Sequence, residues 1–219
     1  MSLNLEGNLR RFLDGRKPNT RYTSFDYCFN YFQSFRDSGN CAAIASAENM
    51  EISCLQLGFY LASWGMLRGS AYLLQRSVRH FVSVVEAIAG MESDIWQIDA
   101  DEYAESNIHR LLDQAKVLRH AGGNMSDTLV TKIMLGVFGS VPAFDTNFKR
   151  GFGVSTFGPK ALRNVGSFYQ RNAKSLDKYR VPTLDFVTEQ PTGRLYTRAK
   201  VIDMAFFIQG MSKGEDAHA

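Results

Sequence analysis

Apolar residues along this chain recur mostly every three or four positions, which is the period of an amphipathic α-helix. No stretch alternates apolar and polar residues for long enough to indicate a β-sheet. Gly, Pro, Ser and Asn separate the helical patterns at short intervals, and the longest irregular piece covers 182–193. We therefore predict an all-α protein of about eight to ten helices. Residues 1–219 are expected to form a single compact domain, and the pattern leaves open whether its helices form two lobes around a cleft.

The segment "FDYCFNYFQSF" carries the densest group of aromatic residues. One stripe of the predicted helix consists of Phe25, Phe29, Phe32 and Phe35. We expect this stripe to pack into the core. Tyr27 and Tyr31 lie on a second stripe. Their hydroxyl groups need polar partners, so these tyrosines either reach such partners at the edge of the core or form a platform on which bases stack.

Composition places the chain among ordinary globular proteins. Its 219 residues are 45% hydrophobic and 21% charged, so it can bury a core without disulfides or metal. Cys28, Cys41 and Cys54 form no CxxC motif, and the four histidines lack the spacing of a zinc site, so we expect no metal and no cofactor. The polar amino terminus and the short apolar runs favour a cytoplasmic protein with reduced cysteines and no membrane contact. A net charge of +3 permits a nucleic-acid partner without requiring one.

The stretch 129–153, "LVTKIMLGVFGSVPAFDTNFKRGFG", holds the most informative pattern. Lys132 shares a face of the predicted helix with two glycines, which remove side-chain bulk beside it. Pro142 ends the helix, and Asp145 stands just before a new helical start. Asp145 is therefore a candidate N-cap, because Asp is among the preferred residues at that position. A lone carboxylate delivered after such a helix is also a candidate for chemistry.

The same residues resemble a known family. A helix with "TK" and apolar residues, then a proline, then an aspartate that opens the next helix is similar to the end of the catalytic half of helix-hairpin-helix DNA glycosylases. These are all-α base-excision repair enzymes of similar length, and "VPAFDTNF" matches the tail of their pattern within residues 126–150. The family's hairpin with spaced glycines and its lyase lysine have no counterpart in "HAGGNMSDTLV". The resemblance therefore implies a monofunctional N-glycosylase-like hydrolase.

In such an enzyme Asp145 is the catalytic residue. Breaking the bond between a base and its sugar builds positive charge on the sugar, and a carboxylate stabilises that charge and orients the attacking water. The base must first be flipped out of the nucleic acid into a pocket. The alternative is that Asp145 only caps a helix.

Trp64 and Arg68 are the candidate substrate-pocket residues, together with Lys132. We expect the segment "EISCLQLGFYLASWGMLRG" to form one helix that ends near Gly69, and the next segment to form another that runs to Gly90. Trp64 and Arg68 then lie one turn apart on one face, where they can form a wall for a planar or anionic group. The alternative is a buried helix whose arginine pairs locally. The run "LASWGMLRGS" also resembles bacterial proteins of unassigned function, which adds no activity.

Lys149, Arg150, Lys160 and Arg163 form the most basic local group, around the glycines at positions 151, 153 and 158. Exposed backbone amides and the start of the following helix can bind phosphate, although a solvated loop is the ordinary state of so small a cluster. These four residues are the candidate nucleic-acid-binding residues. The sequence thus favours a DNA glycosylase-like, nucleic-acid-binding protein. The alternative is a non-catalytic helical protein-interaction module in which Asp145 is only a cap.

Overall fold

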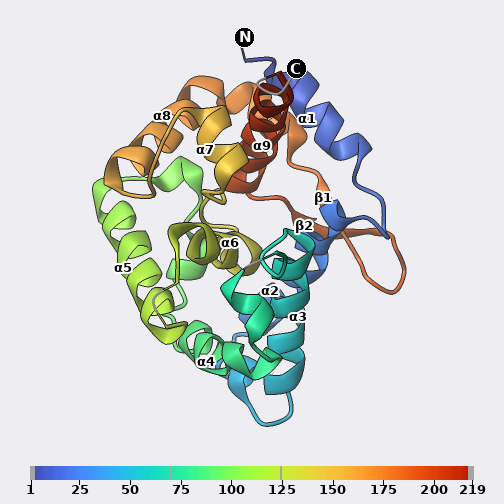
Figure 1. Ribbon diagram of the computed structural model, residues 1–219, viewed down its shortest axis with the longest axis vertical. Helices are drawn as coiled ribbons and strands as arrows, with labels where there is room; N and C mark the ends of the chain where they lie inside the picture. Colours follow the sequence, from blue (N-terminus) through green and yellow to red (C-terminus); the bar gives the residue numbers. More distant parts are fainter. Residues whose placement is uncertain (1–2, 70, 124, 217–219) are drawn as a thin grey trace.

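The computed structural model describes residues 3–69, 71–123 and 125–216. Helices make up most of this part of the chain, so the all-α prediction is confirmed, with one short two-stranded hairpin added (Figure 1). None of the described helices is long and apolar enough to cross a membrane. The elements are α1 (Leu5–Asp14), α2 (Ser24–Asp37), α3 (Met50–Ser63), α4 (Val82–Ala89), α5 (Glu105–Ala121), α6 (Asp127–Phe138), α7 (Thr146–Phe152), α8 (Pro159–Leu176), β1 (Pro182–Leu184), β2 (Pro191–Leu195) and α9 (Arg198–Asp216).

The helix α6 lies in the middle of the molecule, with other helices around it (Figure 1). Every residue from Leu129 to Phe138 is buried, as expected for a helix that is apolar nearly all round. Ser126 Oγ accepts a hydrogen bond from the Leu129 amide at its start (3.3 Å), and Gly139 ends it in the left-handed conformation (φ 67°). Lys132 is one of the buried residues, so α6 carries a charged group into the interior.

The aromatic stripe of α2 packs into the core as predicted, and its first three phenylalanines are buried. The tyrosines of the second stripe reach polar partners within the fold. Tyr27 donates a hydrogen bond to the Pro18 carbonyl (2.8 Å), and the hydroxyl groups of Tyr31 and Ser53 share another (2.8 Å). The hydroxyls are therefore satisfied within the fold, and α2 is a core helix.

The three cysteines are free thiols that pack as small apolar residues. Cys28 and Cys54 are buried, and Cys41 is partly buried. Burial raises the pKa of each thiol, most strongly at Cys28. The reactive thiolate form is therefore suppressed at neutral pH.

The helices α7 and α9 cross at two glycines. A Cβ atom on Gly151 would lie 2.1 Å from the Phe206 carbonyl oxygen, and one on Gly210 would lie 1.8 Å from the Asn147 carbonyl oxygen. Only glycine allows the two backbones to approach so closely. The expectation that Gly151 belongs to an exposed phosphate-binding loop is wrong, because this residue is buried within α7 against α9.

The segment after α3 differs from the two long helices predicted there. The helix stops just before Trp64, because Gly65 and Gly69 adopt left-handed conformations (φ 78° and 58°). Two 3₁₀ turns follow within 72–81 before α4 begins. The prediction that Trp64 and Arg68 share one helical face is therefore wrong, since both residues lie beyond the end of α3.

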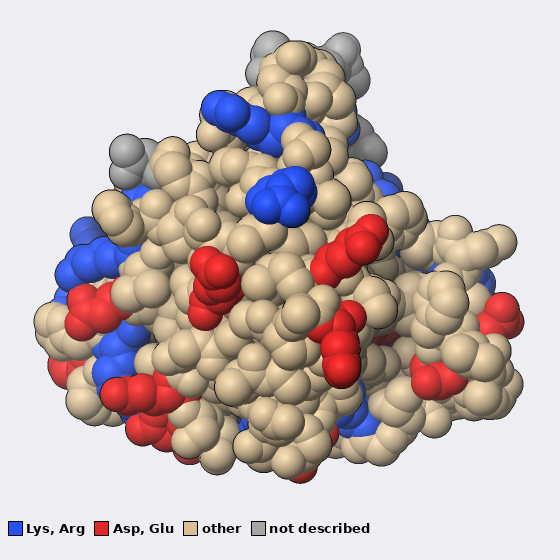
Figure 2. Space-filling view, turned by 90° about the horizontal axis from the view of Figure 1, so that it is seen from below, with Lys and Arg blue, Asp and Glu red and all other residues tan. Residues whose placement is uncertain are grey.

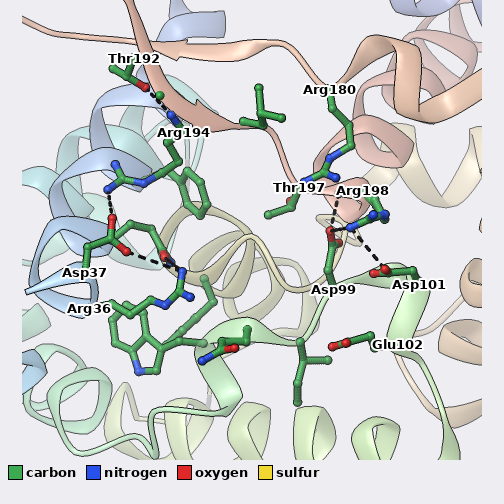
Figure 3. A pocket seen from close by; sticks show the side chains of 18 residues that line it. Arg36, Asp37, Asp99, Asp101, Glu102, Arg180, Thr192, Arg194, Thr197 and Arg198 are labelled. Carbon is green, nitrogen blue, oxygen red and sulfur yellow. Dashed lines mark hydrogen bonds and ion pairs between the residues drawn. The ribbon is translucent and has the colours of Figure 1, made fainter. Parts of the chain in front are cut away.

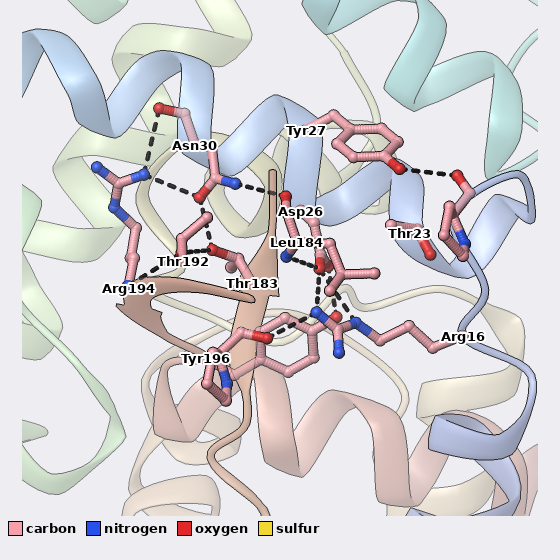
Figure 4. Close-up of polar contacts among 12 residues, drawn as sticks. Arg16, Thr23, Asp26, Tyr27, Asn30, Thr183, Leu184, Thr192, Arg194 and Tyr196 are labelled. Atoms are coloured by element: carbon pink, nitrogen blue, oxygen red, sulfur yellow. Dashed lines mark hydrogen bonds and ion pairs between the residues drawn. The ribbon is translucent and has the colours of Figure 1, made fainter. Parts of the chain in front are cut away.

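The hairpin of β1 and β2 occupies the segment predicted to be irregular, and Asp26 of α2 anchors it (Figure 4). Asp26 accepts hydrogen bonds from the Leu184 amide (2.8 Å) and from the Arg16 guanidinium. Its other carboxylate oxygen accepts one from the Tyr196 hydroxyl (2.5 Å). Burial raises the pKa of Asp26, although the charge of Arg16 opposes the shift. Strands of three and five residues are too short for alternation to reveal them.

Candidate functional site

Asp145 both caps a helix and pairs with a lysine. Its Oδ1 accepts a hydrogen bond from the Phe148 amide at the start of α7 (2.9 Å), and its Oδ2 accepts one from Lys132 Nζ on α6 (3.0 Å). The side chains of Lys132 and Asp145 are 4% and 15% exposed, so the pair lies almost wholly out of water. The N-cap prediction is confirmed, and each carboxylate oxygen has its own partner.

A second lysine–aspartate pair, which the sequence analysis did not identify, lies on α9. Lys200 Nζ donates to Asp203 Oδ2 (3.3 Å), and Asp203 Oδ1 accepts a hydrogen bond from the Ala143 amide (3.0 Å). Burial lowers the pKa of Lys200 and raises that of Asp203, in each case against the effect of the partner's charge. The signal in the sequence is a Lys and an Asp three positions apart inside the apolar run "AKVIDMAFF".

The Trp64 ring lies close to both lysines. Its ring is 5.5 Å from Lys132 Nζ and 5.4 Å from Lys200 Nζ, distances at which the ring attracts an ammonium group. The guanidinium of Arg21 lies 5.2 Å from the same ring. The indole Nε1 is buried and has no hydrogen-bond partner among the described residues. Because buried N–H groups are nearly always paired, this donor marks Trp64 as a position with an unmet polar contact.

The Trp64 ring and the two lysine–aspartate pairs line one small pocket. Its void of about 10 Å³ has room for about one water molecule and none for a base. The ring of Tyr60 forms one wall and lies against α6 where Gly136 has no side chain, since a Cβ there would be 2.3 Å from that ring. Two ammonium and two carboxylate groups therefore meet in a space closed by aromatic rings. The lining residues are Tyr60, Trp64, Lys132, Leu135, Ala143, Asp145, Lys200, Asp203 and Phe207.

The structure brings together three of the four residues proposed for the catalytic and substrate-pocket roles. Trp64, Lys132 and Asp145 reach the pocket from the end of α3, from α6 and from the start of α7. Arg68 does not line it. This arginine is exposed beyond α3, where its side chain folds over Gly65.

The four basic residues proposed to bind nucleic acid lie on α7 and on the first two turns of α8. Arg163 is paired with Glu105 through two hydrogen bonds (2.5 and 2.9 Å), and Arg150 donates to the Gly210 carbonyl (3.2 Å). Lys149 and Lys160 form no ion pair within the described residues. Lys160 borders a surface hollow of about 280 Å³ at the start of α8. Residues 153–156, 158–161 and 164 line this hollow. Arg150 also keeps its positive charge, because its partner is a neutral carbonyl, so Lys149, Arg150 and Lys160 are the charges of this group that no carboxylate neutralises.

A wider hollow, of about 680 Å³, lies between α2, the 96–102 segment, β2 and the start of α9 (Figure 3). Arg198 pairs there with Asp99 (3.6 Å) and Asp101 (3.3 Å), and Arg194 pairs with Asp37 (2.6 Å). These ion pairs link segments that are far apart in the sequence. The charged lining is balanced, since it consists of Arg36, Arg180, Arg194 and Arg198 against Asp37, Asp99, Asp101 and Glu102.

The distribution of surface charge limits which face of the molecule can attract a nucleic acid. Figure 2 shows the end of the molecule that is lowest in Figure 1, where charged side chains of both signs are scattered over a largely uncharged surface. Lys and Arg do not gather on this face without Asp or Glu among them, so it is not the face we assign to nucleic acid. Within the described ranges, no group of three or more His, Cys, Asp or Glu side chains is arranged to hold a metal ion.

Comparison with known protein families, with curated proteins and with solved structures finds no match for this chain.

Proposed function

We propose that this protein is a glycosylase-like hydrolase that acts on a nucleic acid, with Asp145 as its catalytic carboxylate. The observation that carries the proposal is that Asp145, Lys132 and Trp64, which are up to 81 positions apart in the sequence, line one pocket. Asp145 is also the more accessible member of its pair with Lys132. A carboxylate held in a fixed position stabilises a developing cation without having to reorganise, which is the requirement for base release.

The other groups of the pocket have supporting roles in this proposal. Lys132 holds the Asp145 carboxylate in place through its hydrogen bond to Oδ2. Trp64 offers a flat surface for a base and a free N–H donor. Because the void admits only one water molecule, the pocket has to open on binding. Trp64 is the wall best suited to move, since it follows the last residue of α3 and precedes a left-handed glycine.

The test is base release from a panel of duplexes and single strands that each contain one damaged or mispaired base. Asp145→Asn keeps an oxygen for the α7 cap but removes the charge. We expect wild type to release at least one base and Asp145→Asn to lose about 100-fold or more of that rate, with both assayed below their melting temperatures. Asp127→Asn is the matched control, because Asp127 also stands at the start of a helix beside a basic residue, Arg119, but outside the pocket. Release by neither protein, or equal rates for wild type and Asp145→Asn, contradicts the proposal.

The second candidate function is a non-catalytic interaction module. One observation favours it: Phe59 on α3 is 73% exposed, in line with two other exposed apolar residues of the same helix. Large exposed apolar patches mark interaction sites. The two functions are compatible, because α3 presents this face away from the side of the helix that carries Tyr60 to the pocket.

A further inference from the structure

The outward face of α3 is apolar along its whole length. Ile52, Leu55 and Phe59 are 48%, 49% and 73% exposed, and Ala62 is also exposed. Their spacing of three, four and three residues places them in one row, as in the seam of a coiled coil. The opposite face is buried in the core. The row faces water because no described residue covers it (α3 lies at the outside of the lower part of Figure 1).

A hollow lies directly beside Phe59. It measures about 240 Å³ and separates α3 from the 67–81 segment. Gly58 leaves room at its floor, where a Cβ would lie 3.3 Å from the Phe81 ring. A cavity of about 150 Å³ holds a benzene molecule, so this hollow is large enough for a phenyl ring. Its lining is mostly apolar and consists of Leu55, Gly58, Phe59, Ala62, Leu67, Leu73, Arg76, Ser77, Val78 and Phe81.

Charges at the two ends of the row are of opposite sign. Glu48 and Glu51 are exposed at the start of α3, whereas Arg68 is exposed beyond its end and Arg76 is exposed beside the row, in the lining of the hollow. None of these four side chains forms an ion pair within the part of the chain that the structure describes. If a second α3 packs antiparallel against the first, the acidic end of each helix meets the basic end of the other.

We infer that this face of α3 binds a second copy of the same chain around a two-fold axis. The projecting ring and the hollow lie side by side on one surface, so each Phe59 enters the hollow of the other protomer, which is the self-complementarity that a two-fold interface requires. The charges at the ends fix the antiparallel direction. The inference does not depend on the proposed activity, because Trp64, Lys132 and Asp145 take no part in the interface.

The test is the molar mass of the protein in solution, measured by sedimentation equilibrium over a range of concentrations. Wild type is expected to reach twice 24.6 kDa. Phe59→Glu is expected to weaken the dimer by at least about 100-fold, since both copies lose the central ring and bury a charge. Phe186→Glu is the matched control: Phe186 is 71% exposed, but it lies in the hairpin, and this variant is expected to dimerise like wild type.

A charge exchange tests the orientation. Glu51→Arg is expected to weaken the dimer by about 10-fold or less, and adding Arg68→Glu is expected to restore it. A wild-type protein that remains monomeric up to its solubility limit overturns the inference. So does a dimer that Phe59→Glu leaves intact while circular dichroism shows a native fold.

Discussion

At the scale of single residues, the most unusual feature of the interior is its two buried lysine–aspartate pairs. A buried ion pair is costly to desolvate, and apolar residues of similar size often stabilise a protein more. Burial lowers the pKa of Lys200 and raises that of Asp203, so the surroundings of this pair disfavour the charged form of both side chains. Pairs kept under such conditions indicate a requirement other than stability, and the proposed stabilisation of a cation by Asp145 is one such requirement.

The first prediction concerns the cost of breaking the pair of Lys132 and Asp145. Asp145→Asn keeps the cap but removes the carboxylate that is hydrogen-bonded to the buried Lys132 ammonium, so we expect the free energy of unfolding to fall by about 3 kcal/mol. The double variant Lys132→Met/Asp145→Asn removes both charges and is expected to recover at least about half of this loss. Urea denaturation followed by circular dichroism measures both values. If Asp145→Asn changes stability no more than an ordinary cap exchange does, the pair is not energetically coupled.

At the scale of elements, the crossing of α7 and α9 places the two pairs in one pocket. α7 begins at the residue after Asp145, and α9 carries Lys200 and Asp203. The helices touch through glycines, so a small displacement at the crossing moves the charged groups relative to each other. The position of Asp145 therefore depends on Gly151 as well as on its own hydrogen bonds.

The second prediction is that Gly151→Ala destabilises the fold by about 3 kcal/mol or more, because the new methyl group would collide with the Phe206 carbonyl oxygen and a backbone must shift. Gly158→Ala is the control: no atom lies within 4 Å of a Cβ there, and the backbone is extended. This control is expected to stay within about 0.5 kcal/mol of wild type. Thermal unfolding of the three proteins compares them, and equal melting temperatures would exclude a tight crossing.

The same elements show how far the sequence could predict the structure. The caps at Ser126 and Asp145 were predictable, because each stands just before a helix and its own side chain makes the capping bond. The end of α3 was not, because a glycine within an apolar periodic run is compatible with a continuing helix, and only its left-handed conformation stops it. Lys200 and Asp203 were missed because their contact with the Asp145 site arises from the packing of α9, which periodicity does not reveal. The hairpin was missed because its anchor, Asp26, lies on a distant helix.

At the scale of the whole molecule, the proposed function requires a surface that attracts phosphate. The net charge of +3 is too small to do so by itself, and Figure 2 shows one face on which the two signs are mixed. The attraction must then be local, at the group on α7 and α8. In that group Arg163 is neutralised by Glu105, so Lys149, Lys160 and the exposed Arg150 carry the contact.

The last prediction follows from this division of the basic group. Lys149→Ala/Lys160→Ala is expected to weaken binding to single-stranded or duplex DNA and to reduce the slope of log K against log salt by about 2, because each phosphate contact adds about 0.9. Glu105→Ala/Arg163→Ala removes one charge of each sign and is expected to leave both affinity and slope unchanged, which makes it the matched control. Fluorescence anisotropy with a labelled oligonucleotide, repeated at several salt concentrations, measures both quantities. Equal slopes for wild type and the double-lysine variant would remove this surface as a nucleic-acid site, and any base release by the protein would then require a different face to hold the strand.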